Sequence, residues 1–423
     1  MTARPRPRHA KSARPPRGPV QHLHFPGSGL SIRMTGAQPV REALAGAIKG
    51  WAPQILPAPR PGDLCAALTG GTTGGRAGFT ARSPFYEGDL TGLDTAGAAC
   101  ALIADLSEGY LAGRPGCLAL HCGAFRFDGP LILLTGPMRA GKSTLIARLT
   151  AEPDVSIFCD DVLPLTPDFD AIALGIAPRL RLPLPQDATE AFRRHVACAA
   201  GPRDARYAYL ATPNLAPHGQ TARPGTLIVL DRRGSGAAQL HRMDPDQAMH
   251  HLLAQNMGDL GDAERAFALG RHLVGQLACL RLVYADLEEA TALLRRAFAG
   301  DAPACGRLPL APPLPGSPSA PTRSPTPLPP DLVAAQSAGL KLRRMGDGAF
   351  LWSPGAPRLW HLNPIGHAVW ALLELPGSAR DLAQTLSEVF PAIPETQLTA
   401  DIAALLGDLQ AEGFVTTLSG RDA

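Results

Sequence analysis

The chain has 423 residues, of which 45% are hydrophobic and 18% are charged, and its formal net charge is only +3. This length exceeds that of one ordinary core, so we expect two or three domains. The charge gives no argument for nucleic acid as a partner, and no stretch reaches the roughly 18 apolar residues that cross a membrane. The eight cysteines are scattered without a C-x-x-C pair, which is typical of a reduced, cytoplasmic protein.

The first 115 residues divide into a basic tail and a weakly patterned region. Residues 1–20 are rich in Arg and Pro and contain no apolar signal-peptide core. They form either an arm for nucleic acid or membrane or a solvated, disordered tail, and we expect the tail because no apolar face accompanies the charge. Residues 21–115 are expected to form an α+β region packed on the domain that follows it. Their predicted elements are a helix from residue 40 to about Trp51, a hairpin turn over 69–78 and a helix over 95–111.

Residues 116–300 alternate between short apolar runs and helical patterns, which predicts an α/β domain. A loop-like stretch over 171–182 interrupts the alternation and carries Arg179 and Arg181. The predicted strands are 117–120, 124–127 as its partner, 131–134, 155–159, 227–230 and 282–284, and the predicted helices are 144–149, 245–254, 262–280 and 287–298.

Two further segments follow. Residues 301–331 are dominated by Pro and cannot bury a core, so we expect an extended linker. Residues 332–418 are predicted to form a small α+β domain, in which Asn363 caps a helix and Gly413 ends the last one. The predicted elements of this domain are strands at 340–344, 349–352 and 358–362 and helices from 363, over 380–390 and over 396–412.

The most informative motif follows the apolar strand 131–134. It fits G-x-x-x-x-G-K-[ST], the phosphate-binding loop, and a helical pattern comes directly after it. Its glycines let backbone N–H groups surround phosphate oxygens at the positive end of a helix. Lys142 would reach the β- and γ-phosphates, and the Ser143 hydroxyl would bind Mg²⁺. The alternative, a Gly-rich turn that matches by chance, is disfavoured by the flanking strand and helix. The predicted nucleotide-binding residues are Gly136, Pro137, Met138, Arg139, Ala140, Gly141, Lys142, Ser143 and Thr144.

Two carboxylates, Asp160 and Asp161, end the predicted strand 155–159. One could hold Mg²⁺, for which Asp160 is a candidate beside Ser143, and the other could accept or orient the proton of an attacking hydroxyl. The alternative is a solvated pair at a strand–loop junction, but the position of the pair after the phosphate loop favours function. His121 ends an earlier strand, and the pattern leaves a structural and a catalytic role equally open.

Residues 117–165 resemble the core of the HPr serine kinase/phosphorylase superfamily, most of all its shorter HPr-kinase-related members. Those proteins have a His-bearing strand, a hairpin, a phosphate loop that opens a helix, and a strand that ends in an Asp-Asp pair. The resemblance implies the P-loop kinase fold shared with ATP-dependent carboxykinases, Mg-ATP as cofactor and an aspartate as base. The matching residues are His121, Gly136, Gly141, Lys142, Ser143, Asp160 and Asp161.

The chain also departs from the bacterial HPr kinases. Their glycine-rich signature after the acidic pair is missing, and residues 175–183 read GIAPRLRLP instead. This difference argues against HPr as the substrate and against the reverse phosphorylase reaction. Arg179 and Arg181 could neutralise phosphate charge or hold an acidic group of the substrate, or they could be exposed loop arginines. The sequence leaves both interpretations open.

Residues 359–414 resemble PqqD-like domains, which are small winged-helix-like modules. The resemblance implies that residues 332–418 bind the leader of a ribosomally made precursor peptide, which adds as a strand beside the sheet and packs on a helix. The strand at 358–362 and the helix around 398–411 would face the leader. The match rests on Leu362-Asn363-Pro364, Gly366, Trp370 and the closing Leu409, Glu412, Gly413 and Phe414.

Together these features predict an ATP-dependent kinase for a Ser or Thr hydroxyl on a precursor peptide, as in lasso-peptide pathways. Lys142 would hold phosphates, the acidic pair would serve Mg²⁺ and the proton, and His121 would support the pocket. The peptide-binding domain would raise the local concentration of the substrate. One rival is an ATP-hydrolysing switch or chaperone that presents the peptide without phosphorylating it. Another is a degenerate kinase that only binds, against which the intact loop argues. The oligomeric state stays open, a homo-oligomer included.

Overall fold

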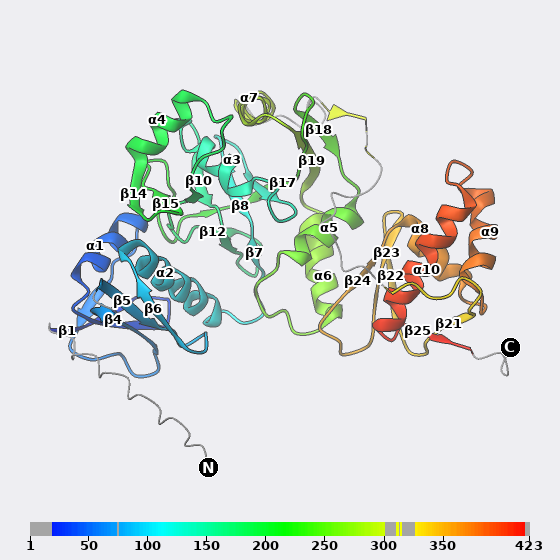
Figure 1. Ribbon diagram of the computed structural model, residues 1–423, viewed down its shortest axis with the longest axis horizontal. Helices are drawn as coiled ribbons and strands as arrows, with labels where there is room; N and C mark the ends of the chain where they lie inside the picture. Colours follow the sequence, from blue (N-terminus) through cyan, green and yellow to red (C-terminus); the bar gives the residue numbers. More distant parts are fainter. Residues whose placement is uncertain (1–18, 74–75, 301–309, 313, 315–325, 419–423) are drawn as a thin grey trace, which may run out of the picture. The chain divides into compact units, whose positions relative to one another are not determined.

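The computed structural model describes residues 19–73, 76–300, 310–312, 314 and 326–418 (Figure 1). The tail predicted over 1–20 and the linker predicted over 301–331 lie mostly outside these residues, and the domain boundaries expected from the sequence stay a prediction. None of the helices in the described part of the chain has the length and apolar character needed to traverse a bilayer. The described residues divide into two compact units. Unit 1 takes those within 1–115, 122–128 and 143–222, and unit 2 takes those within 116–121, 129–142 and 223–423.

Unit 1 begins with a six-stranded sheet in the order β3-β1-β2-β4-β5-β6. β2 and β4 run parallel, and the other neighbours are antiparallel. Helix α2 (Thr95–Ala112) packs against this sheet and against α1 (Gln38–Ala47) (Figure 1). The prediction of α2 is confirmed. The predicted hairpin is present, but the turn predicted over 69–78 is too long, because residues 69–73 and 76–78 belong to the paired strands β4 and β5. The strands are β1 (Val20–Phe25), β2 (Leu30–Thr35), β3 (Gln54–Leu56), β4 (Leu64–Thr73), β5 (Arg76–Arg82) and β6 (Asp89–Leu93).

Helix α1 is shorter than the sequence predicted. It ends at Ala47, and the next residue, Ile48, is already extended with ψ 146°. Here the backbone turns to a distant segment, because the Lys49 N–H donates to the Gly175 carbonyl at 2.7 Å and the Lys49 carbonyl accepts from the His218 N–H at 2.8 Å. These long-range hydrogen bonds replace the helical ones, and no local pattern indicates them.

The rest of unit 1 corrects two predictions. The strand near 124–127 pairs with β10 and not with the strand at 117–120, and the stretch 171–182 contains strands as well as loop. Arg179 and Arg181 lie on one of these strands, β13. The elements are β8 (Gly123–Arg126), β10 (Ser156–Cys159), β11 (Val162–Pro164), β12 (Ala171–Ile172), β13 (Arg179–Arg181), α4 (Glu190–Ala199), β14 (Ala200–Arg203), β15 (Tyr207–Leu210) and β16 (Thr221–Ala222).

Unit 2 contains three adjacent parallel strands, β9 (Leu131–Thr135), β17 (Pro224–Arg232) and β19 (Ala278–Tyr284). β9 is buried along its whole length, as expected for an apolar strand that pairs in parallel and is covered on both faces. The helix predicted over 262–280 is too long, because residues from 278 onward belong to β19. The other elements are β7 (Ala119–His121), α3 (Lys142–Leu149), which continues into unit 1, β18 (Gln239–Arg242), α5 (Pro245–Ala254), α6 (Ala263–Val274), α7 (Leu287–Phe298) and β20 (Leu310–Ala311).

The C-terminal part of unit 2 has the strands and helices that the sequence predicted, together with two strands, β21 and β25, that it did not. Asn363 caps the first helix, since its side-chain oxygen accepts from the Gly366 N–H at 2.8 Å, and Gly413 follows the last helix with φ 76°. The elements are β21 (Ala334–Gln336), β22 (Lys341–Met345), β23 (Gly348–Trp352), β24 (Trp360–Leu362), α8 (Pro364–Leu372), α9 (Ala379–Val389), α10 (Glu395–Ala411) and β25 (Val415–Thr417).

Candidate nucleotide and peptide sites

The segment between β9 and α3 forms a tight loop that depends on glycine. Gly136 has φ 148° and Gly141 has φ 93°, conformations in which other residues are strained. A Cβ atom at Gly136 would lie 2.9 Å from the Leu230 carbonyl oxygen, and one at Gly141 would collide with the Tyr284 hydroxyl. Glycine is therefore required at both positions, as in a loop whose backbone closely surrounds a ligand.

The side chains of this loop divide into an exposed tip and a lysine that folds back. Met138 at the tip is 87% exposed, and Arg139 beside it has φ 68°. Lys142 opens α3, and its ammonium lies 3.4 Å from the Gly136 carbonyl oxygen. Ser143 and the next residue follow on the first turn of the helix. The lysine charge thus lies over the loop backbone, where a phosphate group would need it.

Two residues that the sequence analysis did not single out, Arg232 and Tyr284, also lie beside the loop. They end β17 and β19, which run parallel to β9. The Arg232 Cδ atom lies 3.9 Å from the position of a Cβ on Gly141, and the Tyr284 hydroxyl donates to the Ala140 carbonyl at 2.7 Å. Burial raises the pKa of Tyr284 to about 12, so this phenol stays a donor. The sequence feature that could have indicated Arg232 and Tyr284 is their position at the carboxyl ends of apolar strands that follow the loop.

The two carboxyl groups at the end of β10 differ in their surroundings. Asp160 is only 6% exposed, and its Oδ2 accepts a hydrogen bond from the Arg179 backbone N–H at 3.0 Å. Burial, and then the neighbouring Asp161 carboxylate, raise the pKa of Asp160 to about 7. Asp161 is exposed. Asp160 is therefore the carboxyl group suited to proton transfer near neutral pH.

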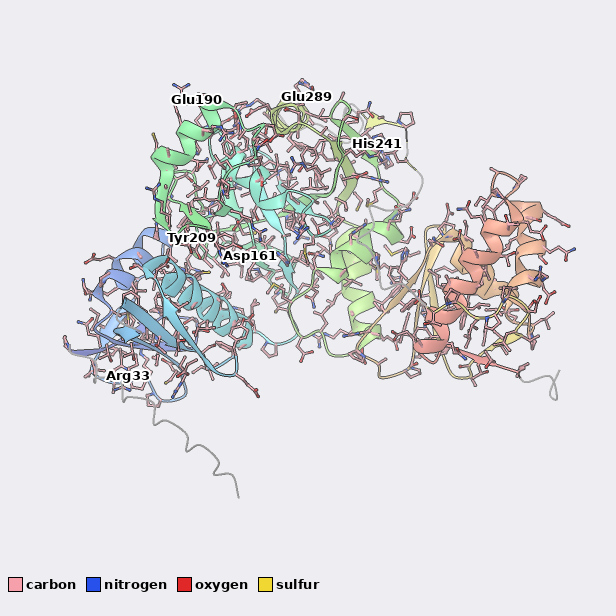
Figure 2. All side chains as sticks on the ribbon, in the orientation of Figure 1. Arg33, Asp161, Glu190, Tyr209, His241 and Glu289 are labelled. Atoms are coloured by element: carbon pink, nitrogen blue, oxygen red, sulfur yellow. The ribbon has the colours of Figure 1, made fainter. Side chains whose placement is uncertain are left out.

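Arg179 and Arg181 lie on a surface formed by the paired strands β13 and β15. They face Tyr209 and Tyr207 respectively across the β13–β15 pair (Figure 2 labels Tyr209), so the four side chains share one face. The Arg179 guanidinium donates to the Cys100 thiol and lies 4.8 Å from the centre of the Tyr207 ring. Arg181 donates to the Tyr207 hydroxyl at 3.2 Å. Arg179 is half-buried and Arg181 is exposed, so the description as an exposed loop arginine does not apply to Arg179.

The residues predicted from sequence fall into two groups. Within unit 1 the structure brings Asp160 together with Arg179. Within unit 2 it brings Lys142 to the glycine loop. His121, also in unit 2, is exposed at the end of β7, and its backbone N–H donates to the Gln255 carbonyl at 2.8 Å. This contact anchors the strand and leaves the role of the His121 imidazole a prediction.

Within the described ranges, no three or more His, Cys, Asp and Glu side chains come together so that they could hold a metal ion. Mg²⁺ commonly binds through one or two carboxylates together with waters and the phosphates of a substrate. Such an ion needs no cage built from protein side chains alone. A hydroxyl such as that of Ser143 and a carboxylate of the acidic pair are chemically suitable ligands.

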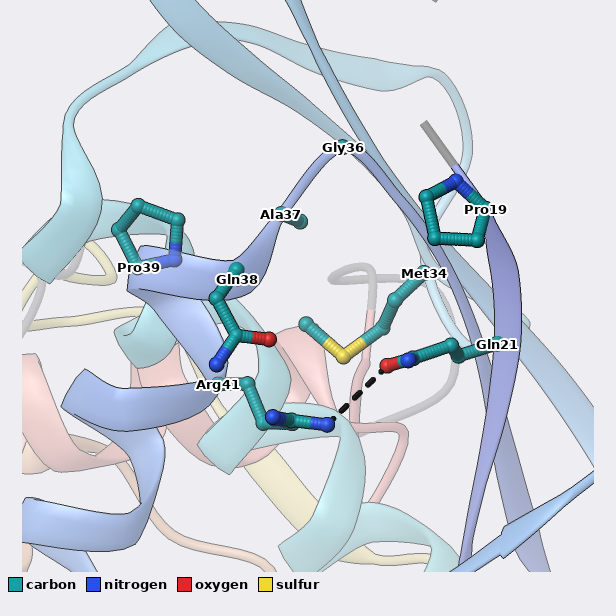
Figure 3. A pocket seen from close by; sticks show the side chains of 8 residues that line it. All are labelled: Pro19, Gln21, Met34, Gly36, Ala37, Gln38, Pro39 and Arg41. Atoms are coloured by element: carbon teal, nitrogen blue, oxygen red, sulfur yellow. Dashed lines mark hydrogen bonds between the residues drawn. The ribbon is translucent and has the colours of Figure 1, made fainter. Parts of the chain in front are cut away.

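A cavity of about 290 Å³ lies in unit 1 beside β1, β2 and the start of α1 (Figure 3). Its one charged lining residue, Arg41, donates to the Gln21 side-chain oxygen at 3.2 Å. Met34 and two prolines supply apolar surface. Among its described lining residues there is no carboxylate, thiol or hydroxyl, so this cavity contains no candidate catalytic group.

In the C-terminal domain, β24 is an edge strand of the β22-β23-β24 sheet. Its Trp360 is half-buried, and the ring packs edge-on against Phe414 at 6.2 Å. Leu405 of α10 is also half-buried, and it approaches the start of α8 at Gly366. A strand edge flanked by apolar side chains is the arrangement to which an extended peptide can add.

A different face of this sheet contacts α5 and α6. The Phe267 ring of α6 stacks on Trp352 at 5.6 Å. Asp246 of α5, only 1% exposed, pairs with the His361 Nε2 atom at 2.8 Å. A Cβ atom at Gly348 would collide with the same carboxylate. The C-terminal domain is therefore docked within unit 2 through specific contacts.

Residues 348–415 match the family model of coenzyme PQQ synthesis protein D (PqqD). The C-terminal domain is PqqD-like. The match extends from β23 through α10 to the first residue of β25. The comparison with curated proteins gives no match. The resemblance of the preceding residues to HPr-kinase-related proteins rests on their motifs and stays a prediction.

Proposed function

We propose that the protein is a Mg-ATP-dependent kinase that phosphorylates a Ser or Thr hydroxyl on a precursor peptide recruited by the PqqD-like domain. The observation that carries the proposal is a buried carboxyl group, Asp160, with a pKa of about 7 in a chain that also has a glycine-dependent loop with a lysine over it. A phosphate loop alone would serve many nucleotide-binding proteins. A kinase also has to accept or orient the proton of its acceptor hydroxyl.

The loop residues fit the triphosphate of a nucleotide. Gly136 and Gly141 leave no room for a side chain, so their backbone can approach phosphate oxygens. Lys142 would neutralise phosphate charge, and Arg232 would add a second positive charge beside Gly141. Ser143 would offer its hydroxyl to Mg²⁺. Bound Mg-ATP would supply the phosphoryl group and part of the charge compensation for its transfer.

The two aspartates receive different roles in this proposal. Asp160 would accept the proton of the substrate hydroxyl, because its pKa lies near neutral pH. The Arg179 backbone N–H, which already bonds its Oδ2, would keep this carboxyl group in one orientation. Asp161, which is exposed, would serve Mg²⁺ as a hard oxygen ligand. Most of the rate acceleration would come from positioning and charge stabilisation.

The PqqD-like domain indicates a role in binding precursor peptides. The leader would add to the edge of β24 and pack its side chains against Trp360 and Leu405. Because the domain is docked through Asp246 and Phe267, its position would be defined by contacts as well as by the linker. Leader binding would then raise the local concentration of the acceptor segment.

The proposal is tested with the full chain, ATP labelled at the γ-phosphate, Mg²⁺ and a short precursor-like peptide encoded beside the gene. We expect label on a Ser or Thr of the peptide, located by mass spectrometry, and its loss in Lys142→Ala. Lys341→Ala is the matched control, since this lysine pairs with Glu264 in unit 2. Release of free phosphate without labelled peptide would favour the chaperone. ATP affinity unaffected by Lys142→Ala would favour a binding adaptor.

A further inference from the structure

A second cavity in unit 1, of about 220 Å³, lies between the first turns of α2 and the β13–β15 strands. It is distinct from the phosphate loop, and its wall combines guanidinium groups with tyrosine rings. Its size suits one amino-acid side chain or the end of a peptide rather than a folded partner. The lining residues with polar groups are Cys100, Arg179, Asp204, Arg206, Tyr207 and Tyr209.

The charges of this cavity favour an anion. The one carboxylate in its lining, Asp204, uses Oδ1 to accept from the Arg206 N–H at 2.6 Å and the Tyr207 N–H at 2.7 Å, so it organises its own turn. The Arg206 guanidinium is exposed and forms no hydrogen bond or ion pair within the described part of the chain. The cavity lining therefore contains two arginines and one carboxylate, and that carboxylate is engaged by the backbone of its own turn.

The cavity is linked directly to the acidic pair. Arg179 donates its backbone N–H to the Asp160 carboxyl group, and its side chain lines the cavity over the Tyr207 ring. Beside Arg179, on the neighbouring strand, Tyr209 is 4% exposed, and burial together with the Cys100 thiol raises its pKa well above the ordinary range. Tyr209 therefore remains a neutral hydroxyl that can donate. Arg179 thus contacts the candidate base, Asp160, through its backbone and lines the cavity with its side chain.

We propose that this cavity binds a carboxylate carried by the acceptor peptide, close to the hydroxyl that is phosphorylated. Its role in acceptor selection rests on the proposed function. A guanidinium presents paired N–H donors that match the two oxygens of a carboxylate, and the rings of Tyr207 and Tyr209 exclude water from one side. The carboxylate comes from an acidic side chain next to the acceptor or from the peptide C-terminus. The enzyme would thereby recognise a negative charge near the acceptor hydroxyl in addition to binding the leader.

The experiment measures binding of four small probes to the full chain without nucleotide, by ligand-observed saturation-transfer NMR. The probes are N-acetyl-Ser-Glu-amide, its Gln counterpart, N-acetylserine and N-acetylserine amide. We expect each acid to bind about tenfold more tightly than its neutral counterpart, the usual scale for a hydrogen bond to a charged group. Arg206→Gln and Arg179→Gln should remove the difference, and Arg179→Lys should restore part of it because charge is kept and the paired donors are lost.

Arg194→Gln is the matched control, because this arginine lies exposed on α4, away from the cavity lining. Its binding should equal that of the wild type, and thermal unfolding should show that the exposed Arg206→Gln variant folds. Equal binding of acid and neutral probes, no binding of either acid, or an equal loss in Arg194→Gln would overturn the proposal. Preference for N-acetylserine would identify a chain terminus, and preference for the Ser-Glu probe an acidic neighbour; both outcomes support a carboxylate site.

The two proposals can fail separately. If the acids bind selectively but no peptide is labelled with Mg-ATP, the carboxylate site stands and the kinase assignment fails. If a precursor peptide is labelled equally well before and after its carboxylates are converted to amides, the kinase assignment stands and the carboxylate site fails.

Discussion

The glycine loop of unit 2 and the acidic pair of unit 1 are constructed in opposite ways. The loop owes its shape to neighbouring residues, with Gly136 and Gly141 in backbone conformations that few other residues adopt. Asp160 owes its pKa to burial and to contacts with a segment 19 residues away. The comparison shows that a binding loop can be encoded locally, whereas the acidity of a carboxyl group is a property of the tertiary structure.

The largest expected effect concerns Asp160, whose acidity depends on the tertiary structure. Asp160→Asn should lower the rate of peptide phosphorylation by about 10²–10⁴-fold, the range for loss of a general base, while ATP affinity stays near that of the wild type. The wild-type rate should rise with pH through about 7, the pKa of Asp160, and that rise should be missing from the residual activity of the variant. Normal turnover in both Asp160→Asn and Asp161→Asn would remove the acidic pair from the mechanism.

Asp160 also has a consequence for stability that does not depend on activity. Its pKa in the folded protein is raised from 3.8 to about 7. The stability associated with its proton is therefore complete below pH 3.8 and is lost as pH rises through 7. The loss is on the order of 4 kcal/mol. Between pH 5 and pH 8, urea unfolding should show the part of this decline that lies in that window, about 2.7 kcal/mol, in the wild type and a smaller decline in Asp160→Asn. Identical declines would mean that Asp160 is not buried.

Gly141→Ala tests whether the shape of the phosphate-binding loop depends on glycine, as the local encoding of the loop predicts. The new methyl group would collide with the Tyr284 hydroxyl at a backbone φ of 93°, so we expect a loss of about 2–3 kcal/mol in unfolding free energy and much weaker ATP binding. Adding Tyr284→Phe removes the collision but not the backbone strain, so recovery should be partial. Gly129→Ala is the control, since nothing lies within 4 Å of its Cβ position. Wild-type ATP binding by Gly141→Ala would show that the loop tolerates a side chain.

The same contrast explains which parts of the fold could be predicted. The C-terminal helices, the Asn363 cap and the strand before the phosphate loop follow from periodicity and capping within a few residues. Strand β13 could not be found this way, because Arg179 and Arg181 are polar and its partner β15 lies far along the chain. For the candidate site, the sequence indicated the acidic pair and the loop lysine. It did not indicate Arg232, Tyr284 or the burial of Asp160, because those depend on which strand ends meet.

Histidines at the contact between α5 and the PqqD-like domain also have pKa values set by the tertiary structure, and we expect a smaller effect on stability from them than from Asp160. Burial, and then the neighbouring imidazoles, lower the pKa of His250 and of His251 to about 4. The His250 ring stacks on His361 at 4.8 Å. Because a lowered pKa means that the folded state resists protonation, the stability that these groups contribute is present above pH 6.5 and is lost as pH falls toward 4.

His250→Gln should therefore reduce the loss of unfolding free energy between about pH 7.5 and pH 5 by roughly 2 kcal/mol. Urea unfolding at the two pH values measures this directly. His272→Gln serves as the control, because His272 is exposed at the end of α6. An unchanged pH dependence in His250→Gln would assign the acid sensitivity to other groups.

The smallest expected effect distinguishes peptide recruitment from the chemical step. Leu405→Glu places a charge at the half-buried position beside α8, where the leader is proposed to pack, and should raise the KM for a full-length precursor about tenfold, the cost of about 1.4 kcal/mol of lost binding. The KM for a leaderless peptide should not change. Leu375→Glu, at a leucine that is 77% exposed in the same domain, controls for added charge.

A point variant is more informative than deletion of 332–423, because deletion would also uncover Phe267 and Asp246, which the domain covers in unit 2. Equal effects of Leu405→Glu on both peptides would argue that the domain stabilises the enzyme rather than recruiting the leader.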